Sequence, residues 1–290
     1  MPEWRNTKPA RAITFYLIPV LVYMVFFSVY PLVYSLYLSF THSSLSLPTT
    51  EFVGLKNYAD LVVDPSFGPV LAQTLEFVGA AVGLEFCIGL LLALVLNQEF
   101  RGVRAFRFIC MLPMMMMPVV VALMWRFMYH GDIGLVNFLL NLVELPGTVW
   151  LGNQTTAMMA IILTDVWQWT AFCFLVLLAG LQSLPMEPFE AARVDGASRW
   201  AIFTRVTLPM LKPAIVVALL FRIMDAFKVF DFIFVMTGGG PGQSTYTMSF
   251  LIFRWAFYFG DTGMASALSY VLLIIVSVVF MLFARLTRLE

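Results

Sequence analysis

Four charged residues alternate in sign at intervals of three along an otherwise apolar stretch: Arg222, Asp225, Lys228 and Asp231. Side chains three residues apart are neighbours on a helix, so each charge can be neutralised by the next one. Charged groups inside a membrane are costly and nearly always face protein or a water-filled cavity. Two interpretations stay open: the charges line a pathway and bind substrate hydroxyls, or they hold a partner helix through buried ion pairs.

A second polar cluster lies earlier in the chain, where residues 165–172 read DVWQWTAF. Aromatic rings such as Trp169 and Phe172 can stack on the apolar faces of a sugar, while Asp165 and Gln168 bind its hydroxyl groups. This combination predicts a sugar site inside the membrane. The alternative is an aromatic belt at the membrane surface, with the carboxylate near the lipid headgroups.

The longest polar-rich run extends from Glu190 to Pro213 and reads EAARVDGASRWAIFTRVTLPMLKP. Its first residues favour a helix, which Gly196 can end, and Ser198 can cap a second helix. We expect Pro209 and Pro213 to stop this second helix before the next apolar segment. A short amphipathic helical knob suits docking in a partner's groove, and the alternative is an interfacial helix without a partner.

The composition is that of a membrane protein. The chain has 290 residues, of which 61% are hydrophobic and 12% charged, with a mean hydropathy of +0.90. Zero net charge gives no electrostatic reason to bind nucleic acid. The three cysteines lie in apolar runs, and His42 and His130 lack metal-ligand spacing, so we expect neither a disulfide framework nor a metal site. The glycine-rich segment 237–242 lacks the Lys-Ser/Thr of a phosphate loop, so we expect no ATP site or other cofactor.

Six apolar segments are long enough to span a membrane. We expect the first to be tilted or broken near Pro31. In the third, Pro113 and Pro118 bracket four methionines, which predicts a kinked helix at a moving interface or, equally, irregular core packing. The segments are approximately residues 13–40, 70–96, 108–128, 157–181, 214–236 and 264–286.

The positive charges predict the orientation of the chain, because cytoplasmic connections of membrane proteins are rich in Lys and Arg. Lys56 and Arg254 lie on one side of the predicted bundle, and most of the other cations lie on the opposite side. Both termini and the polar run are therefore predicted to be cytoplasmic. The cations on that side are Arg5, Lys8, Arg11, Arg101, Arg104, Arg107, Arg193, Arg199, Arg205, Lys212, Arg285 and Arg288.

The polar run resembles the EAA loop of permease subunits from ABC importers: E-A-A, three residues, G-A, a spaced Phe, L-P and a closing Pro. The matching positions are Glu190, Ala191, Ala192, Asp195, Gly196, Ala197, Phe203, Leu208, Pro209 and Pro213. The segment 52–58 (FVGLKNY), the run 220–231 (LFRIMDAFKVFD) and the turn 237–241 (TGGGP) are similar to segments of sugar permeases. The chain thus resembles a sugar-type ABC importer permease of the maltose and glycerol-phosphate class.

The resemblance implies an all-α membrane protein with the type I importer fold, six spanning helices and cytoplasmic termini. It implies a single transmembrane domain over 1–290, with an N-terminal helix and connection over 1–69 and core helices over 70–286 that contain a cytoplasmic coupling loop at 187–213. In that loop it assigns ATPase coupling to Glu190, Ala191, Ala192, Asp195, Gly196, Ala197 and Phe203. It places Asp165, Gln168, Trp169, Phe172, Arg222, Asp225 and Lys228 in the substrate pathway, where the side chains differ from those of the maltose permease.

The resemblance also implies the assembly. A second permease subunit completes the pore, two ATPase subunits bind the cytoplasmic loops with their own ATP and magnesium, and an extracytoplasmic solute-binding protein delivers the sugar. The chain itself is expected to be a transport subunit without catalytic residues, in a bacterial or archaeal inner membrane. The substrate class is a disaccharide, a polyol or a glycoside. The rival functions are an ion-driven secondary transporter, with the charges at 222–231 as a relay, and a membrane assembly subunit without a pore.

Overall fold

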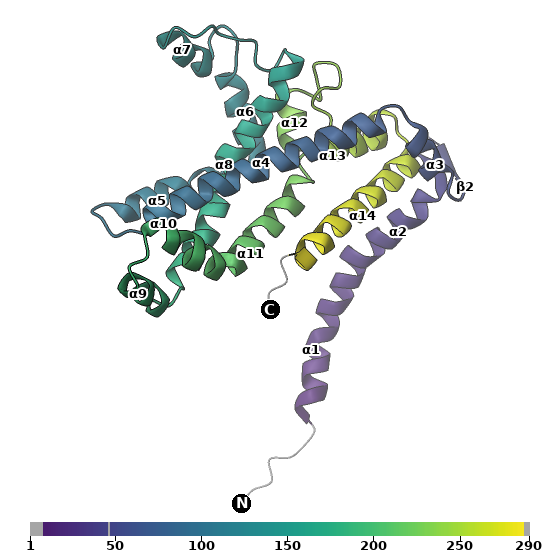
Figure 1. The fold of residues 1–290 in the computed structure, drawn as a ribbon. Coiled ribbons are helices and arrows are strands. Elements are labelled where there is room, and N and C mark those ends of the chain that lie inside the picture. The colour runs from purple at the N-terminus through teal and green to yellow at the C-terminus, as the bar shows by residue number, and fades with distance from the viewer. Residues whose placement is uncertain (1–7, 46, 287–290) are drawn as a thin grey trace, which may run out of the picture. The chain divides into compact units, whose positions relative to one another are not determined.

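The computed structural model describes residues 8–45 and 47–286 of the chain. These residues form a mostly helical protein with a short β-hairpin (Figure 1). They divide into two compact units, one within residues 1–64 and 252–271 and the other within 65–251 and 272–290. Arg5 and Arg288, which the orientation prediction uses, lie outside the described residues.

The first unit begins with a long apolar helical segment. The helix α1 (Lys8–Met24), the π-helical turn η1 (Val25–Val29) and the helix α2 (Tyr30–Ser39) follow one another directly. The π-turn lies just before Pro31, whose nitrogen cannot donate a hydrogen bond, so the expected irregularity is a wide turn and not a break. The unit also contains β1 (Thr41–Ser44), β2 (Leu47–Phe52), α3 (Lys56–Val63), the π-turn η4 (Arg254–Tyr258) and the first part of α14 (Thr262–Leu286).

The hairpin in this unit occupies a stretch for which the sequence indicated only a polar connection. Strands β1 and β2 are antiparallel, with Thr41 opposite Phe52. After the hairpin, Asn57 Nδ2 donates to the backbone oxygens of Ser39 and Thr41, both at 2.9 Å. The Tyr58 hydroxyl donates to Ser39 Oγ at 2.8 Å. The permease-like segment 52–58 therefore ties α3 to the end of α2, which is a structural role.

The second unit is built around two long helices, α4 (Phe67–Leu96) and α8 (Gln154–Gln182). They approach closely at Gly89, where a Cβ atom would lie 2.7 Å from Cys173 Cβ. A buried apolar cluster joins these helices to α11 (Leu208–Ala226); it is formed by Ala93, Leu96, Phe174, Leu177, Leu178, Leu181 and Leu211. The remaining helices are α5 (Val103–Met111), α6 (Pro118–Met128), α7 (Leu135–Leu142), α9 (Glu187–Val194), α10 (Arg199–Ile202), α11 (Leu208–Ala226), α12 (Asp231–Met236) and part of α13 (Met248–Phe253).

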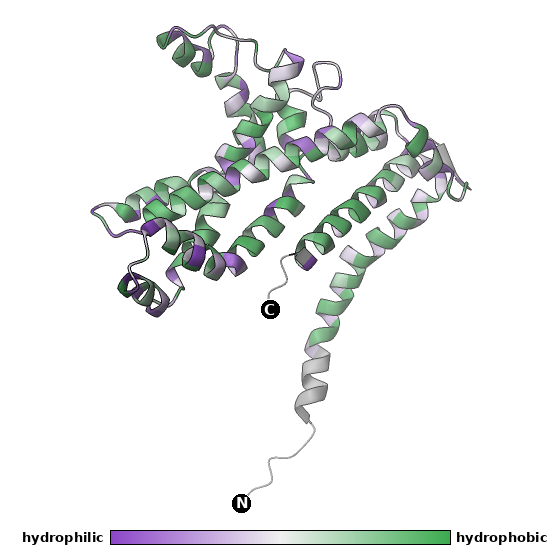
Figure 2. Cartoon of the chain, in the orientation of Figure 1, coloured by the Kyte–Doolittle hydropathy of each residue, from purple (hydrophilic) through white to green (hydrophobic). Residues whose placement is uncertain are grey.

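Among the described residues, five helical segments are long and apolar enough to cross a membrane: Tyr16–Ser39, Phe67–Leu96, Gln154–Gln182, Arg199–Ala226 and Thr262–Arg285. Figure 2 shows that these segments are mostly hydrophobic along their length. Four of them coincide with predicted spans, and Arg199–Ala226 overlaps the first part of the predicted span 214–236, so the chain is a multi-pass membrane protein. The predicted span 108–128 is covered in part by a shorter apolar helix, α6.

This third predicted span is broken rather than kinked. A short 3₁₀ turn (Pro113–Met115) follows α5, and Met116 and Met117 are then extended, with ψ angles of 146° and 134°. The cause is the second proline, because the residue before a proline avoids the helical conformation and Pro118 itself is favoured in the first turn of a helix, where it lies in α6. The break leaves backbone groups at Met116 that need other partners.

The expectation that prolines end the second helix of the polar run is wrong. The helix α10, the π-turn η3 (Phe203–Thr207) and α11 form one helical segment from Arg199 to Ala226. In η3 the Leu208 N–H donates to the oxygen of Phe203, five residues back, and Pro209 comes directly after this wide turn. The polar run is therefore joined to a spanning helix without an intervening loop.

The fifth predicted span, 214–236, is interrupted near its middle. Helix α11 ends at Ala226 and α12 begins at Asp231. Between them the chain turns, with the Lys228 N–H bonded to the Asp225 oxygen at 2.9 Å. Asp231 lies in the first turn of α12, where a carboxylate is favoured by the helix dipole. The four alternating charges therefore do not lie on one continuous helix, and that part of the sequence interpretation is wrong.

Candidate functional site

A buried charge cluster centres on Arg222 of α11. Its Nη2 donates to Glu85 Oε1 at 2.8 Å and to Asp165 Oδ2 at 2.9 Å, and its Nε bonds the other oxygen of Glu85. Its Nη1 donates to Asp225 Oδ2 at 3.0 Å. Arg222 is 2% exposed and Glu85 is 0% exposed, so neither side chain contacts lipid. Each buried charge is compensated by the opposite charge that it is bonded to. The cluster joins α4, α8 and α11.

Arg222 and Asp225 form the predicted ion pair on α11, and Lys228 also pairs with Asp225. Asp225 accepts from Arg222 and also from Lys228, whose Nζ lies 3.2 Å from Asp225 Oδ1. The Lys228 side chain is 67% exposed, so it lies at the open end of the cluster. The sequence predicted pairing within this segment, but the additional partners Glu85 and Asp165 come from other helices.

Glu85 is a member of the cluster that the sequence analysis missed. It lies in the apolar run of α4, between Leu84 and Phe86, and its side chain is completely buried. A carboxylate within a spanning segment is itself a signal of a functional or structural site. That rule, applied to Glu85, would have indicated a partner cation, although the identity of the partner needs the fold.

Five of the predicted pathway residues line a cavity of about 330 Å³. Its polar wall is formed by Arg222, Asp225 and Lys228, and its aromatic wall by Trp169, Phe172 and Phe221. The Arg222 guanidinium carbon lies 5.0 Å from the centre of the Trp169 ring, within the range of a cation–π contact. The volume is within the range of small-molecule sites, about 300–1,000 Å³.

A smaller cavity of about 150 Å³ adjoins this one, because both are lined by Trp169, Asp225 and Lys228. It is also lined by Asp165 and by Asp231 of α12. The two cavities therefore bring together six of the seven residues predicted for the substrate pathway. They combine flat aromatic faces with carboxylate acceptors, which is a chemistry suited to a polyhydroxylated ring.

Gln168 is the predicted pathway residue that lines neither cavity. It is buried, and its Nε2 donates to the backbone oxygen of Met116 at 2.8 Å. Met116 lies in the break between α5 and α6, so Gln168 satisfies a carbonyl group that the prolines release from helical bonding. The side chain therefore connects α8 to the broken segment.

The first part of the polar run forms two short helices with a tight turn between them. Helix α9 contains Glu190, Ala191 and Ala192 and ends at Val194, and Gly196, two residues later, has a φ angle of +74°. The Gly196 N–H bonds the Arg193 oxygen at 3.1 Å and the Ala197 N–H bonds the Ala192 oxygen at 2.9 Å, which is a Schellman turn. Ser198 Oγ then accepts from the Ala201 N–H at 3.2 Å and begins α10. The helix end and cap predicted from the sequence are confirmed.

The surface of these two helices is open. Among the described residues, α9 and α10 contain none that is buried. Val194 is 88% exposed and Trp200 72%, which is unusual for large apolar side chains outside a membrane or an interface. Phe203, at the start of η3, is half-buried and packs with Trp200 at 5.6 Å between ring centres. The predicted coupling residues thus lie on one protruding element.

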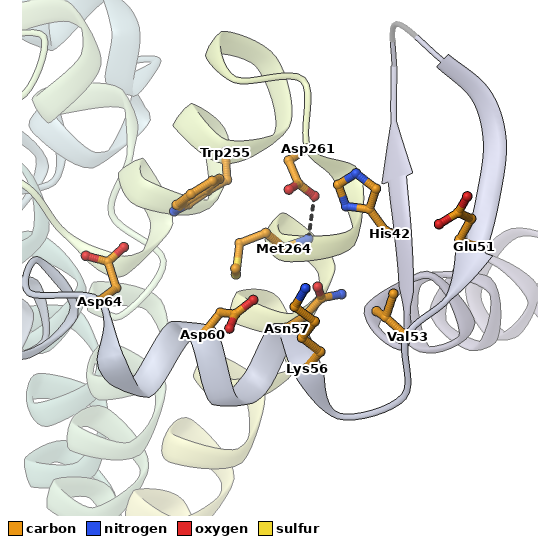
Figure 3. A pocket seen from close by; sticks show the side chains of 10 residues that line it. All are labelled: His42, Glu51, Val53, Lys56, Asn57, Asp60, Asp64, Trp255, Asp261 and Met264. Carbon is orange, nitrogen blue, oxygen red and sulfur yellow. Dashed lines mark hydrogen bonds between the residues drawn. The ribbon is translucent and has the colours of Figure 1, made fainter.

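A larger cavity, of about 470 Å³, lies within the first unit. Figure 3 shows its lining, with Asp60 and Asn57 on α3, His42 on the hairpin, and Trp255 and Asp261 from the C-terminal part of the unit. Asp261 Oδ1 accepts from the Met264 N–H at 2.8 Å and so caps α14. The described residues contain no group of His, Cys, Asp and Glu that could hold a metal ion. The carboxylates in its lining make the cavity polar and acidic, and it shares no lining residue with the two cavities beside Arg222.

Comparison with known families gives a match to the model described as "Binding-protein-dependent transport system inner membrane component", over residues 85–289. The chain is 37% identical over 275 residues to the trehalose/maltose transport system permease protein MalF of Thermococcus litoralis, covering 94% of this chain and 93% of that protein. It is 37% identical over 278 residues to the trehalose transport system permease protein SugA of Mycobacterium tuberculosis, covering 95% and 89%. It is 36% identical over 288 residues to the sulfoquinovosyl glycerol permease protein SmoG of Agrobacterium fabrum, covering 99% and 93%.

Among solved structures, a bacterial ABC transporter involved in the import of the acidic polysaccharide alginate is similar in fold. The TM-score is 0.86, with 24% sequence identity and coverage of 98% of both chains. A structure of the alginate transporter with its pentasaccharide-bound periplasmic protein gives 0.85, at 23% identity, covering 98% of this chain and 96% of that one. This level of identity supports the fold and not the substrate.

Proposed function

The chain belongs to the family of binding-protein-dependent transport system inner membrane components and is a permease of an ABC sugar importer; on this premise we propose how it moves its substrate. It forms half of the translocation pathway for a disaccharide, polyol or glycoside. The cavity lined by Trp169, Phe172 and the Arg222 cluster is the part of the pathway that contacts the sugar. The protruding helices α9 and α10 are the part that binds an ATPase subunit.

One observation carries this proposal: a single helical segment, Arg199–Ala226, connects the two sites. Trp200 and Phe203 lie at one end of it, and Arg222 and Asp225 near the other. The 23 helical steps from Arg199 to Arg222 correspond to roughly 35 Å of helix at 1.5 Å per residue. A displacement of the loop by an ATPase would therefore act directly on the cavity wall, with no flexible linker between them.

The proposed topology has six spans in a single transmembrane domain, residues 1–290. The third of these spans consists of α5 and α6 with the break at Met116 and Met117. Broken helices are tolerated in a membrane where other groups satisfy the freed backbone, as Gln168 does for Met116. The cation distribution supports cytoplasmic termini and a cytoplasmic loop 187–213, in a bacterial or archaeal inner membrane.

The proposed assembly contains a second, different permease, two ATPase subunits that hold ATP and magnesium, and an extracytoplasmic solute-binding protein. The curated relatives named for trehalose, maltose and sulfoquinovosyl glycerol support a sugar or glycoside as the substrate, and the periplasmic protein in the alginate transporter structure supports a binding-protein partner. In this mechanism, ATP binding closes the ATPases and draws the two coupling loops together, so that the spanning helices open outward. The binding protein then releases its sugar into the cavity, and hydrolysis restores the inward-facing state.

The test is Gly196→Pro in the assembled importer. Proline cannot adopt a φ of +74°, and it removes the N–H that bonds Arg193, so α9 loses its orientation relative to α10. We expect loss of sugar uptake and of ATPase stimulation by the binding protein, at a normal amount of membrane-inserted subunit. Gly102→Pro is the matched control, because Gly102 also has a positive φ (+89°) but lies outside the loop. Normal uptake by the Gly196 variant would contradict the coupling role.

A further inference from the structure

The two cavities beside Arg222 contain more acidic than basic groups. Asp165, Asp225 and Asp231 line one or both cavities, and Glu85 lies directly behind them on Arg222. The basic groups that line the same space are Arg222 and Lys228. Arg222, Glu85 and Asp165 are buried together, so the charged groups in the open part of this space are Asp225, Asp231 and Lys228. These groups carry more negative than positive charge, and their field is weakly screened in the low-dielectric environment of a membrane.

Arg222 has almost no capacity left for an anion. A guanidinium has five N–H donors, and here Nε, both N–H groups of Nη2 and one of Nη1 are used by Glu85, Asp165 and Asp225. Recognition of a carboxylate or phosphate by arginine normally needs two parallel N–H groups. The remaining N–H on Nη1 can donate to a single hydroxyl. Arg222 therefore acts as the centre of the cluster and is not an anion receptor.

Lys228 does not provide a free positive charge that could bind an anion either. Its ammonium group is bonded to Asp225 at 3.2 Å, and its side chain is 67% exposed. Asp225 is shared between Lys228 and Arg222, and its side chain is 44% exposed. An incoming anion would meet the Asp225 carboxylate at the same place as the ammonium, whereas a neutral hydroxyl can donate to the carboxylate or accept from the ammonium.

From this charge distribution we infer that the cavity takes an uncharged, polyhydroxylated substrate and excludes sugars that carry a carboxylate, phosphate or sulfonate. The inference rests on the proposed function and narrows its substrate class. The aromatic wall of Trp169, Phe172 and Phe221 offers flat apolar faces for the C–H surfaces of a sugar ring. The carboxylates of Asp225 and Asp231 offer acceptors for its hydroxyl groups.

The charge of the cavity can be measured without knowing the sugar. Met224, which lines the larger cavity and is 40% exposed, is replaced by cysteine in the assembled importer, with Cys87, Cys110 and Cys173 replaced by alanine. The rates of labelling are measured with two methanethiosulfonates of similar size, one bearing trimethylammonium and the other sulfonate. Their ratio is divided by the same ratio at Gln243→Cys, an exposed position in the turn after α12. We expect the cationic reagent to be favoured by at least about tenfold.

Two further variants sharpen the result. Asp231→Asn, which leaves the Arg222 bonds intact, is expected to lower the ratio, and Lys228→Gln to raise it. A normalised ratio of one or less overturns the inference. Absence of labelling at both Met224→Cys and Phe221→Cys also overturns it, because it would show that the cavity is not accessible from water. Uptake of sugar with ATP and the binding protein is measured in parallel. Selective labelling without any ATP-driven uptake would contradict the proposed function and leave the charge of the cavity established.

Discussion

The Arg222 cluster and the proposed coupling helices, α9 and α10, are held in place by different means. In the cluster, side chains bond side chains: one guanidinium connects carboxylates on α4, α8 and α11, and all of these groups except Asp225 are buried. In the coupling helices, backbone bonds around Gly196 and the cap at Ser198 fix the shape, and the side chains are open. The charged groups of the cluster are bonded mainly to one another, whereas the side chains of α9 and α10 remain exposed and can contact a partner protein.

Because of this difference, we expect substitutions in the cluster to lower stability and substitutions in α9 and α10 to weaken binding to a partner. Charged groups within a membrane must be neutralised inside the protein, so a substitution in the cluster exposes uncompensated charge and acts on folding. A backbone-defined knob in water keeps its shape when an exposed side chain is removed, so a substitution there acts on the partner. The predictions below test this separation, from the largest effect on folding to the smallest.

Arg222→Met is expected to have the largest effect on folding. It removes the common partner of Glu85, Asp165 and Asp225 and leaves buried carboxylates unpaired, at a cost of about 3–5 kcal/mol. The recovery of folded subunit and the thermal midpoint of the purified importer measure it. Arg126→Met is the control, because exposed Arg126 bonds a single backbone oxygen, that of Val235. Equal losses for the two variants would contradict the central place of Arg222.

Gln168→Leu is expected to have an intermediate effect. It removes the donor to the Met116 oxygen and leaves a carbonyl group in the broken segment without that bond, which costs about 1–3 kcal/mol. Denaturant titration of the purified importer measures the loss. Gln182→Leu makes the same change at the exposed end of α8 and should be near neutral. If Gln168→Leu is as stable as this control, then the bond from Gln168 to Met116 does not stabilise the broken segment between α5 and α6.

Trp200→Ala is expected to leave the free energy of unfolding within about 0.5 kcal/mol of the original, because the ring is 72% exposed. Its effect should appear in coupling, since exposed aromatic residues at the centre of an interface can contribute 2 kcal/mol or more to binding. We expect at least a tenfold loss of ATPase stimulation by the binding protein. Phe257→Ala removes an equally exposed ring in the first unit and should change neither property. Unchanged stimulation in the Trp200 variant would remove this residue from the interface.

Local signals in the sequence predicted the local structure well. Gly196 and Ser198 were identified as a helix end and a cap because both act within a few residues, and five apolar spans were found by their length. The proline signals were less reliable. Pro118 breaks its segment, whereas Pro209 is absorbed after a π-turn whose wider hydrogen bonding no residue type specifies. Interhelical partners were beyond reach, because the pairing of Glu85 with Arg222 depends on helices 137 positions apart in the chain.

The candidate site was predicted only in part, because residue types can be read from the sequence but contacts between helices cannot. Six of the seven residues assigned to the pathway line the two adjoining cavities, since residue type and helical depth were sufficient to select them. Gln168 was assigned by the same criteria but faces the broken segment, and helical spacing alone does not distinguish these two directions. The separation of Asp231 from α11 also required the structure, because the turn at 227–230 has no glycine or proline to mark it.

The central claim is that the helix from Arg199 to Ala226 transmits movement of the coupling loop to the cavity. The most direct test is the labelling rate of Met224→Cys in the reconstituted importer, with and without ATP and the binding protein. We predict a change of several-fold in the intact helix, and no change when two glycines inserted between Val206 and Thr207 uncouple its ends. An equal ATP-dependent change in both proteins would contradict the account.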